Sequence, residues 1–279
     1  CMEGYTEIDK VCYFVKDIDF LEVFINNSQL KDSITQEALD PLDLGWQIWE
    51  DGRLIEFCSS TSTNTECRMN YALSGNIPIE IGNLTELKKI SLESNKLSGK
   101  IPSQIKHLHK LEELKFSSNQ LTGSLPIEIG QLGSLKILAL NSNLFTGSLP
   151  IEIKKLSNLR WVYLASNQFE GNIPISFGNM LHLTYLNLSN NQFEGTIPSE
   201  LGNLSKLQYL NLARNKLTGI IPSEIGNLTS LTYLNLSSND LTGEIPPEIG
   251  NLTNLIWLSL YSNSLTGEIL SEIGSLTNL

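Results

Sequence analysis

The sequence repeats itself with a period of 24 residues. Residues 185–204 read YLNLSNNQFEGTIPSELGNL, residues 209–228 read YLNLARNKLTGIIPSEIGNL, and residues 233–252 read YLNLSSNDLTGEIPPEIGNL. A fixed period of this length indicates stacked supersecondary units, each of which contacts mainly its neighbours. One asparagine fixes the register, and it recurs at Asn95, Asn119, Asn143, Asn167, Asn191, Asn215, Asn239 and Asn263.

Each constant position of the repeat has a physical role. The alternating L-x-L stretch predicts a short strand whose leucines point inward while the x residues face solvent. The asparagine that follows can donate to and accept from turn backbone, so stacked copies would form a buried asparagine ladder. A glycine permits a tight turn, Ile-Pro fixes an extended segment, and I-G-x-L returns to the core as a short helical turn. No unit can bury its leucines alone, so we predict a solenoid with one continuous core.

The full pattern, L-x-x-L-x-L-x-x-N-x-L-[TSE]-G-x-I-P-x-x-I-G-x-L, resembles the plant-type leucine-rich repeat of receptor-kinase ectodomains and polygalacturonase-inhibiting proteins. The resemblance covers residues 68–279 as a degenerate first repeat with Tyr71 in place of the asparagine, eight full repeats and a truncated last one. It implies an α/β fold, a right-handed leucine-rich-repeat solenoid with a concave parallel β-sheet. A second, shorter set of strands is implied near T-G-x-I-P.

Residues 1–67 form a separate N-terminal module. Residues 16–27 have helical apolar spacing, and residues 46–58 predict a strand, an Asp-Gly turn and a second strand. A tryptophan-bearing segment, a G-R-L strand and a cysteine pair also resemble the family's N-terminal cap, although Cys58 and Cys67 are further apart than usual and Cys1 and Cys12 are an addition. We predict that this capping module covers the first open edge of the core. Nothing comparable closes the other end, so we expect the chain to be a piece of a longer protein.

All four cysteines lie in this module, at Cys1, Cys12, Cys58 and Cys67. An even count confined to one terminal module predicts disulfides and an oxidising compartment, and the absence of CxxC spacing argues against a metal site. Four cysteines allow three pairings. Local pairing, Cys1 with Cys12 and Cys58 with Cys67, is the simplest, and free buried thiols are the alternative.

The net charge of −11 lies almost entirely in the cap, because residues 1–67 hold 14 acidic and 4 basic side chains. The chain shows no dominant basic face, which argues against nucleic acid as a partner. No run of 18 apolar residues occurs, so we expect no membrane insertion within this chain.

Catalytic signatures are absent from the sequence. It has no G-x-S-x-G, no phosphate loop and no H-E-x-x-H. His107 and His109 alternate as metal ligands do, but no carboxylate or cysteine cluster is in register with them, so we interpret them as surface residues. We therefore expect no enzyme activity, no cofactor and no metal.

One of the variable columns of the repeat is rich in aromatic residues. The position directly before the L-x-L pair is aromatic in five consecutive repeats, and a large exposed apolar patch usually marks a contact site. Aromatics beside asparagines suit a protein hot spot or stacking against sugar rings, while the competing interpretation is that the rings only stabilise the sheet. The candidate ligand-binding residues are Trp161, Tyr163, Tyr185, Asn187, Tyr209, Asn211, Tyr233, Asn235, Trp257 and Tyr261.

The sequence therefore predicts a non-catalytic extracellular recognition module that binds a protein or peptide on its concave aromatic-rich face. The alternatives are recognition of a carbohydrate, such as a cell-wall polysaccharide, and a structural or adhesion solenoid. Ice binding is disfavoured, because the outer columns mix Lys, Ser, Asn, Thr, Ile and Glu instead of presenting a regular Thr array.

Seven N-x-[ST] sequons support a secreted glycoprotein, although copying of the repeat inflates their number. Two of them, at Asn187 and Asn235, fall in the aromatic strands, and we expect these to stay bare. The expected glycosylation sites are Asn26, Asn83, Asn203, Asn227 and Asn251.

Overall fold

The computed structural model describes residues 1–30, 37–60 and 71–279. The chain forms two compact units, Cys1–Leu144 and Phe145–Leu279. The expected boundary between the cap and the repeats, at residues 67 and 68, lies outside the described residues and stays a prediction.

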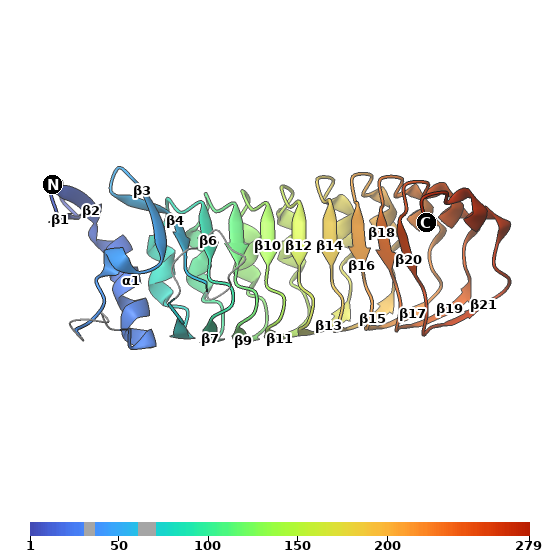
Figure 1. The fold of residues 1–279 in the computed structure, drawn as a ribbon, viewed down its shortest axis with the longest axis horizontal. Helices are drawn as coiled ribbons and strands as arrows, with labels where there is room; N and C mark the ends of the chain where they lie inside the picture. Colours follow the sequence, from blue (N-terminus) through green and yellow to red (C-terminus); the bar gives the residue numbers. More distant parts are fainter. Residues whose placement is uncertain (31–36, 61–70) are drawn as a thin grey trace. The chain divides into compact units, whose positions relative to one another are not determined.

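The first unit opens with the cap. Strands β1 (Tyr5–Ile8) and β2 (Val11–Phe14) form an antiparallel hairpin, which leads into helix α1 (Val15–Ser28). After a short 3₁₀ helix, η1 (Pro41–Asp43), strands β3 (Trp46–Glu50) and β4 (Arg53–Cys58) pair antiparallel, with a register shift between Ile48 and Trp49. The predicted helix and the predicted strand, turn and strand are confirmed (Figure 1).

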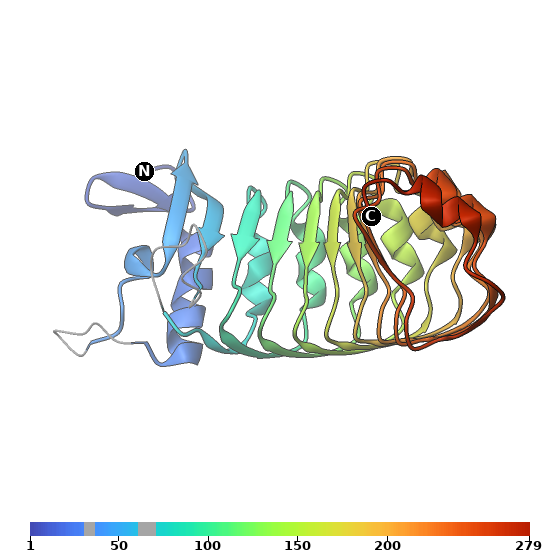
Figure 2. The same cartoon turned by 45° about the vertical axis from the view of Figure 1, so that its right-hand side comes forward.

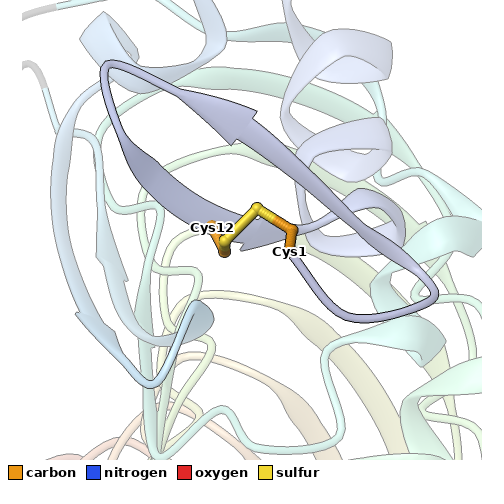
Figure 3. The surroundings of a disulfide bond; sticks show 2 residues. All are labelled: Cys1 and Cys12. Carbon is orange, nitrogen blue, oxygen red and sulfur yellow. A yellow bond between two sulfur atoms is a disulfide. The ribbon is translucent and has the colours of Figure 1, made fainter.

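A disulfide joins Cys1 to Cys12, with the two Cα atoms 5.5 Å apart, and ties the start of the chain to strand β2 (Figure 3). This part of the local pairing is confirmed. Cys58 is also disulfide-bonded. Its expected partner, Cys67, lies outside the described residues.

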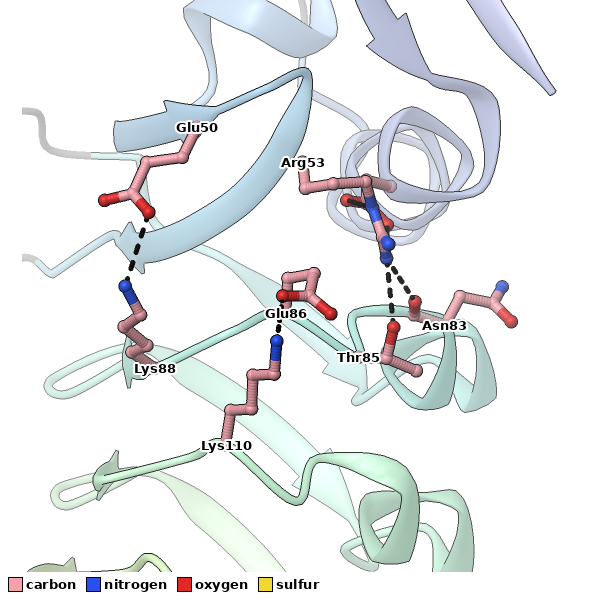
Figure 4. A network of polar contacts seen from close by, with 8 residues as sticks. Glu50, Arg53, Asn83, Thr85, Glu86, Lys88 and Lys110 are labelled. Atoms are coloured by element: carbon pink, nitrogen blue, oxygen red, sulfur yellow. Dashed lines mark hydrogen bonds and ion pairs between the residues drawn. The ribbon is translucent and has the colours of Figure 1, made fainter. Parts of the chain in front are cut away.

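A buried ion pair joins helix α1 of the cap to strand β4. Asp17 of α1 has no exposed surface, and it accepts hydrogen bonds from Arg53 Nε and from the Leu54 amide, both at 2.9 Å. Arg53 Nη2 also donates to the Asn83 carbonyl and to the Thr85 hydroxyl in the first repeat (Figure 4). Burial raises the pKa of Asp17, although the hydrogen bonds from Arg53 and Leu54 act in the opposite direction. Removing one partner would leave an uncompensated buried charge, which typically costs about 3–5 kcal/mol.

Each of the eight full repeats contributes one strand to a parallel sheet, which we call the main sheet (Figure 1). In the first unit β4 of the cap pairs directly with β6, so the cap continues this sheet. The remaining strands of the first unit are β6 (Lys89–Ser91), β8 (Glu113–Lys115) and β10 (Ile137–Ala139). Those of the second unit are β12 (Trp161–Tyr163), β14 (Tyr185–Asn187), β16 (Tyr209–Asn211), β18 (Tyr233–Asn235) and β20 (Trp257–Ser259).

A second set of short parallel strands follows the ladder asparagines, as predicted for the segment near T-G-x-I-P. In the first unit these strands are β5 (Ser74–Asn76), β7 (Lys96–Gly99) and β9 (Gln120–Gly123). Strand β11 (Leu144–Gly147) pairs with β13. The strands of the second unit are β13 (Gln168–Asn172), β15 (Gln192–Thr196), β17 (Lys216–Gly219), β19 (Asp240–Glu244) and β21 (Ser264–Thr266).

The I-G-x-L segments form 3₁₀ helices that return the chain to the next strand (Figure 2). Those of the first unit are η2 (Ile79–Asn83), η3 (Ser103–His107) and η4 (Ile127–Gln131). Those of the second unit are η5 (Ile151–Lys155), η6 (Ile175–Asn179), η7 (Ser199–Asn203), η8 (Ser223–Asn227), η9 (Pro247–Asn251) and η10 (Ser271–Ser275).

The predicted asparagine ladder is present. The Nδ2 of Asn191 donates to its own turn at the Leu188 carbonyl (3.1 Å) and to the Leu164 carbonyl of the preceding repeat (3.0 Å). Its Oδ1 accepts from the Phe169 amide, also in the preceding repeat (3.0 Å). At the start of the ladder, Asn95 donates to the Ser59 carbonyl of the cap at 2.7 Å. Each asparagine thus closes its own turn and fastens it to the turn before it.

Close approach between neighbouring 3₁₀ helices explains the glycine of I-G-x-L. A Cβ built on Gly202 would lie 2.4 Å from the carbonyl oxygen of Glu224 in the next repeat. Gly178, Gly226 and Gly250 meet the next repeat in the same way, at 2.3 to 2.8 Å. These glycines are therefore needed for the spacing between repeats.

We predict that Gly202→Ala lowers the free energy of unfolding by about 2 kcal/mol, because backbone must shift to admit the methyl group. Gly133→Ala is the matched control, since a Cβ there would meet no atom within 4 Å. Denaturant unfolding followed by circular dichroism measures both. Equal effects of the two substitutions would contradict the close-approach explanation.

Candidate functional site

The aromatic column lies on the main sheet of the second unit. Parallel pairing places Tyr185 opposite Tyr209, Tyr209 opposite Tyr233, and Tyr233 opposite Trp257. The leucines between the x positions, such as Leu186 and Leu210, are fully buried. The strict period of the repeat therefore brings side chains 24 residues apart into direct contact on one face.

The rings of this column stack on one another. The ring centroids of Tyr185 and Tyr209 are 4.1 Å apart, and those of Tyr209 and Tyr233 are 4.3 Å apart, with the planes within 8° of parallel. Trp257 continues the stack beyond Tyr233 at 6.1 Å. At the other end Tyr163, from the neighbouring column, packs against Tyr185 at 4.5 Å. The parallel stack therefore runs from Tyr185 to Trp257, and Tyr163 packs against its end with a ring tilted by 34° from that of Tyr185.

Stacking decides which parts of the rings a ligand can reach. The three stacked tyrosines are half-buried, and each covers a face of its neighbour. Tyr261, in a more distant column, is 63% exposed. Along the centre of the stack the accessible groups are ring edges and hydroxyls.

A column of amide side chains runs beside the rings. Asn211 and Asn235 donate from Nδ2 to the hydroxyls of Tyr209 and Tyr233, each at 3.3 Å. The Oδ1 of Asn235 accepts from the Ser237 amide at 3.1 Å and from the Ser237 hydroxyl at 2.7 Å. The tyrosines and asparagines therefore form one ordered polar and aromatic ridge, which we call the tyrosine ridge.

Burial raises the pKa of Tyr185, Tyr209 and Tyr233 above the usual range. The asparagine hydrogen bonds and some contacts between neighbouring hydroxyls lower the pKa values, but burial outweighs them. The hydroxyls are therefore neutral hydrogen-bonding groups at physiological pH.

On strands β6 and β8 of the first unit, the positions equivalent to the ring column carry the charged residues Lys89 and Glu113. Lys88 pairs with Glu50, Lys89 with Glu56, Lys115 with Glu113, Lys136 with Glu112, and Lys110 with Glu86. Two of these pairs are visible in Figure 4. Exposed pairs of this kind contribute only about 0–1 kcal/mol each. They show that these five lysines are neutralised by acidic neighbours.

Within residues 1–30, 37–60 and 71–279, no group of three His, Cys, Asp or Glu side chains is placed to hold a metal ion. No helix in this described part of the chain is both long and apolar enough to cross a membrane.

Family models match two stretches of the chain. The model described as leucine-rich repeat region matches residues 167–279, and the model described as leucine rich repeat matches residues 85–145. Comparison with curated proteins gives no match.

Solved structures match over most of the chain. The ectodomain of the Arabidopsis thaliana receptor kinase GASSHO1/SCHENGEN3, solved with CASPARIAN STRIP INTEGRITY FACTOR 2, is 34% identical with a TM-score of 0.84, over 95% of this chain and 31% of its own. The Arabidopsis receptor kinase HAESA, solved with the peptide hormone IDA and the co-receptor SERK1, is 43% identical with a TM-score of 0.68, over 70% of this chain and 33% of its own. A plant ice-binding protein is 25% identical with a TM-score of 0.67, and the match covers 93% of this chain and 90% of that protein.

Repeat, ladder and sheet define the chain as an α/β solenoid protein. It belongs to the leucine-rich repeat proteins, and its similarity to receptor-kinase ectodomains makes it one of the plant type. The chain spans about a third of the length of the two receptor structures.

The sequons differ in their surroundings. Asn203, Asn227 and Asn251 are exposed at the ends of η7, η8 and η9, and the hydroxyl residues two positions on are exposed as well. Asn187 and Asn235 are half-buried, and the Oδ1 of each accepts from the serine hydroxyl of its own sequon at 2.7 Å.

We predict that the raised pKa values separate Tyr185, Tyr209 and Tyr233 from exposed tyrosines in an alkaline titration. Because their pKa is higher folded than unfolded, their contribution to stability is complete below about pH 10 and is lost as pH rises through the raised values. Phenolate absorbance should show a late phase that disappears in denaturant. A single transition in the native protein would contradict this assignment.

We also predict the pattern of glycosylation in protein made through a secretory pathway. Asn203, Asn227 and Asn251 should carry glycans, with Asn187 and Asn235 mostly bare, because a glycan there would disrupt the sequon hydrogen bonds and cover the rings. Asn26 is exposed and should be modified too. Asn83 should be modified less, since Arg53 binds the hydroxyl of Thr85. Glycopeptide mass spectrometry measures occupancy, and full occupancy of Asn187 and Asn235 would overturn the prediction.

Proposed function

We propose that this chain is a non-catalytic extracellular recognition module whose tyrosine ridge binds a protein or peptide ligand. The observation that carries the proposal is the stack itself. Stacking leaves a row of hydroxyls, ring edges and amides along the sheet, and these groups suit hydrogen bonding to an extended polypeptide. The receptor ectodomains that resemble this chain were solved with peptide or protein partners, which supports the same class of ligand here.

The geometry favours this ligand over a carbohydrate. Sugar recognition by aromatic residues uses the open face of a ring, whereas the faces of Tyr209 are covered on both sides by Tyr185 and Tyr233. Ice binding requires a flat, regular array of uncharged groups. The second strand set instead exposes charged residues in one column with threonines, including Glu170 and Glu194.

The stack also changes how a binding test must be designed. Truncating Tyr209 to alanine would uncover the rings on either side, so stability would fall together with affinity. Tyr209→Phe removes the hydroxyl and keeps the stacked ring, and it therefore separates recognition from packing.

We predict that Tyr209→Phe weakens a peptide ligand by about 1 kcal/mol with little change in melting temperature. Replacing Tyr209 and Tyr233 together by alanine should cost on the order of 2 kcal/mol or more of affinity. A peptide selected from a displayed random library against the unmodified protein serves as ligand, and titration calorimetry measures its affinity.

Glu248→Ala, an exposed substitution on helix η9, is the control and should bind normally. The carbohydrate alternative would be favoured if no peptide could be selected and if the protein bound a glycan on an array. That glycan binding should then be lost in the tyrosine variants. Unchanged affinity in every tyrosine variant would mean that the ridge is purely structural.

A further inference from the structure

A hollow lies on another part of the second unit, where the second strand set meets the 3₁₀ helices. It has a volume of about 390 Å³ and is bounded by the ends of β13, β15 and β17 and the segments that follow them. None of its lining residues belongs to the tyrosine ridge. The lining is Asn172, Ile173, Ile175, Thr196, Ile197, Pro198, Ser199, Glu200, Ile220 and Pro222.

Small departures from the repeat create this hollow. In the middle of its three repeats, Thr196 is smaller than Ile220 of the following repeat, and Ser199 is smaller than Ile175 of the preceding repeat. The other flanking residues in these two columns are Asn172 and Ser223. These two isoleucines are 63% and 65% exposed. At the position of Ile220, the other repeats have only polar or charged residues. An apolar residue there is thus an exception at the position where the hollow forms.

The surroundings of the hollow are acidic. Glu200 contributes to its lining, and Glu170, Glu194 and Glu224 lie two residues from other lining residues, all three exposed. Lys216 is the one cation in residues 168–175, 192–200 and 216–224, and it donates to Gln192 at 3.1 Å. Apolar walls within an anionic rim complement a side chain that has an apolar stem and a cationic head.

We propose that this hollow anchors an arginine of a basic segment in a partner polypeptide. The aliphatic stem would lie between Ile175 and Ile220, and the guanidinium would reach the Glu200 carboxylate. The hydroxyls of Thr196 and Ser199 and the amide oxygen of Asn172 supply further acceptors, which suit the several donors of a guanidinium. This contact is separate from the tyrosine ridge and gives the second unit a second recognition surface.

The test uses two fluorescein-labelled pentapeptides, GLRLG and a twin in which citrulline replaces the arginine. Citrulline keeps the shape of the side chain and removes its charge. In fluorescence anisotropy at low salt we expect saturable binding of the arginine peptide and affinity at least about tenfold lower for the citrulline twin. Methyl spectra of the isoleucines should shift at Ile175, Ile197 and Ile220 when the arginine peptide is added.

Matched variants locate the contact. Glu200→Gln should weaken the arginine peptide about tenfold, and Ile220→Thr, which copies the residue of the preceding repeat, should weaken it about fivefold. Glu248→Gln, at the equivalent position two repeats on and outside the rim of the hollow, should change affinity less than about twofold. Melting curves establish that each variant is folded, and Tyr209→Phe should leave this binding unchanged whatever the tyrosine ridge binds.

Three outcomes would each overturn the proposal. Equal affinity for the citrulline twin would mean that the hollow takes any apolar side chain. An equal loss with Glu248→Gln would mean diffuse attraction to an acidic surface. Failure of the arginine peptide to bind the unmodified protein, with no isoleucine shifts, would mean that the hollow is not an anchor site.

Discussion

The hydrogen bonds of the ladder asparagines are the interaction on which the remaining structure depends. Each side chain both donates to and accepts from main-chain groups of the preceding turn, as Asn191 does at Leu164 and Phe169. Without it, turn amides and carbonyls would be buried without partners, which costs about 1–3 kcal/mol for each group. Because equivalent bonds recur along the ladder from Asn95 to Asn263, they fix the register of each strand against the next.

Fixed register explains the character of the candidate site. Tyr185, Tyr209 and Tyr233 stack because their strands are aligned residue for residue, and the stack orders their hydroxyls and the neighbouring amides. One set of contacts therefore stabilises the sheet and orders the groups that the proposed ligand would meet. Such preorganisation reduces the conformational entropy lost on binding. Packing and recognition, which the sequence presents as rival interpretations, are compatible here.

Much of the fold follows from the sequence, because each feature depends on local chemistry repeated at a fixed spacing. The strands, the ladder and the 3₁₀ turns are of this kind. The ion pair between Asp17 and Arg53 could not be predicted in this way, since it joins residues 36 positions apart in a module without repeats. The pattern also could not show that Tyr163, from the neighbouring column, packs against Tyr185, because that depends on how side chains pack. The hollow beside Thr196 could have been found by comparing column by column the sizes of residues between repeats.

The register shift between strands β3 and β4 affects how such a chain can be lengthened or joined to another. Among the described strands of the first unit, β3 is the outermost of the main sheet. An outermost strand offers unpaired backbone groups to any other strand it meets. The irregularity between Ile48 and Trp49 interrupts that template, and Glu50 places a charge at the end of the strand. A second molecule therefore cannot add to this edge as readily as one repeat adds to another. Duplication of a repeat within the gene lengthens the molecule, while end-to-end fibre formation through the cap is hindered.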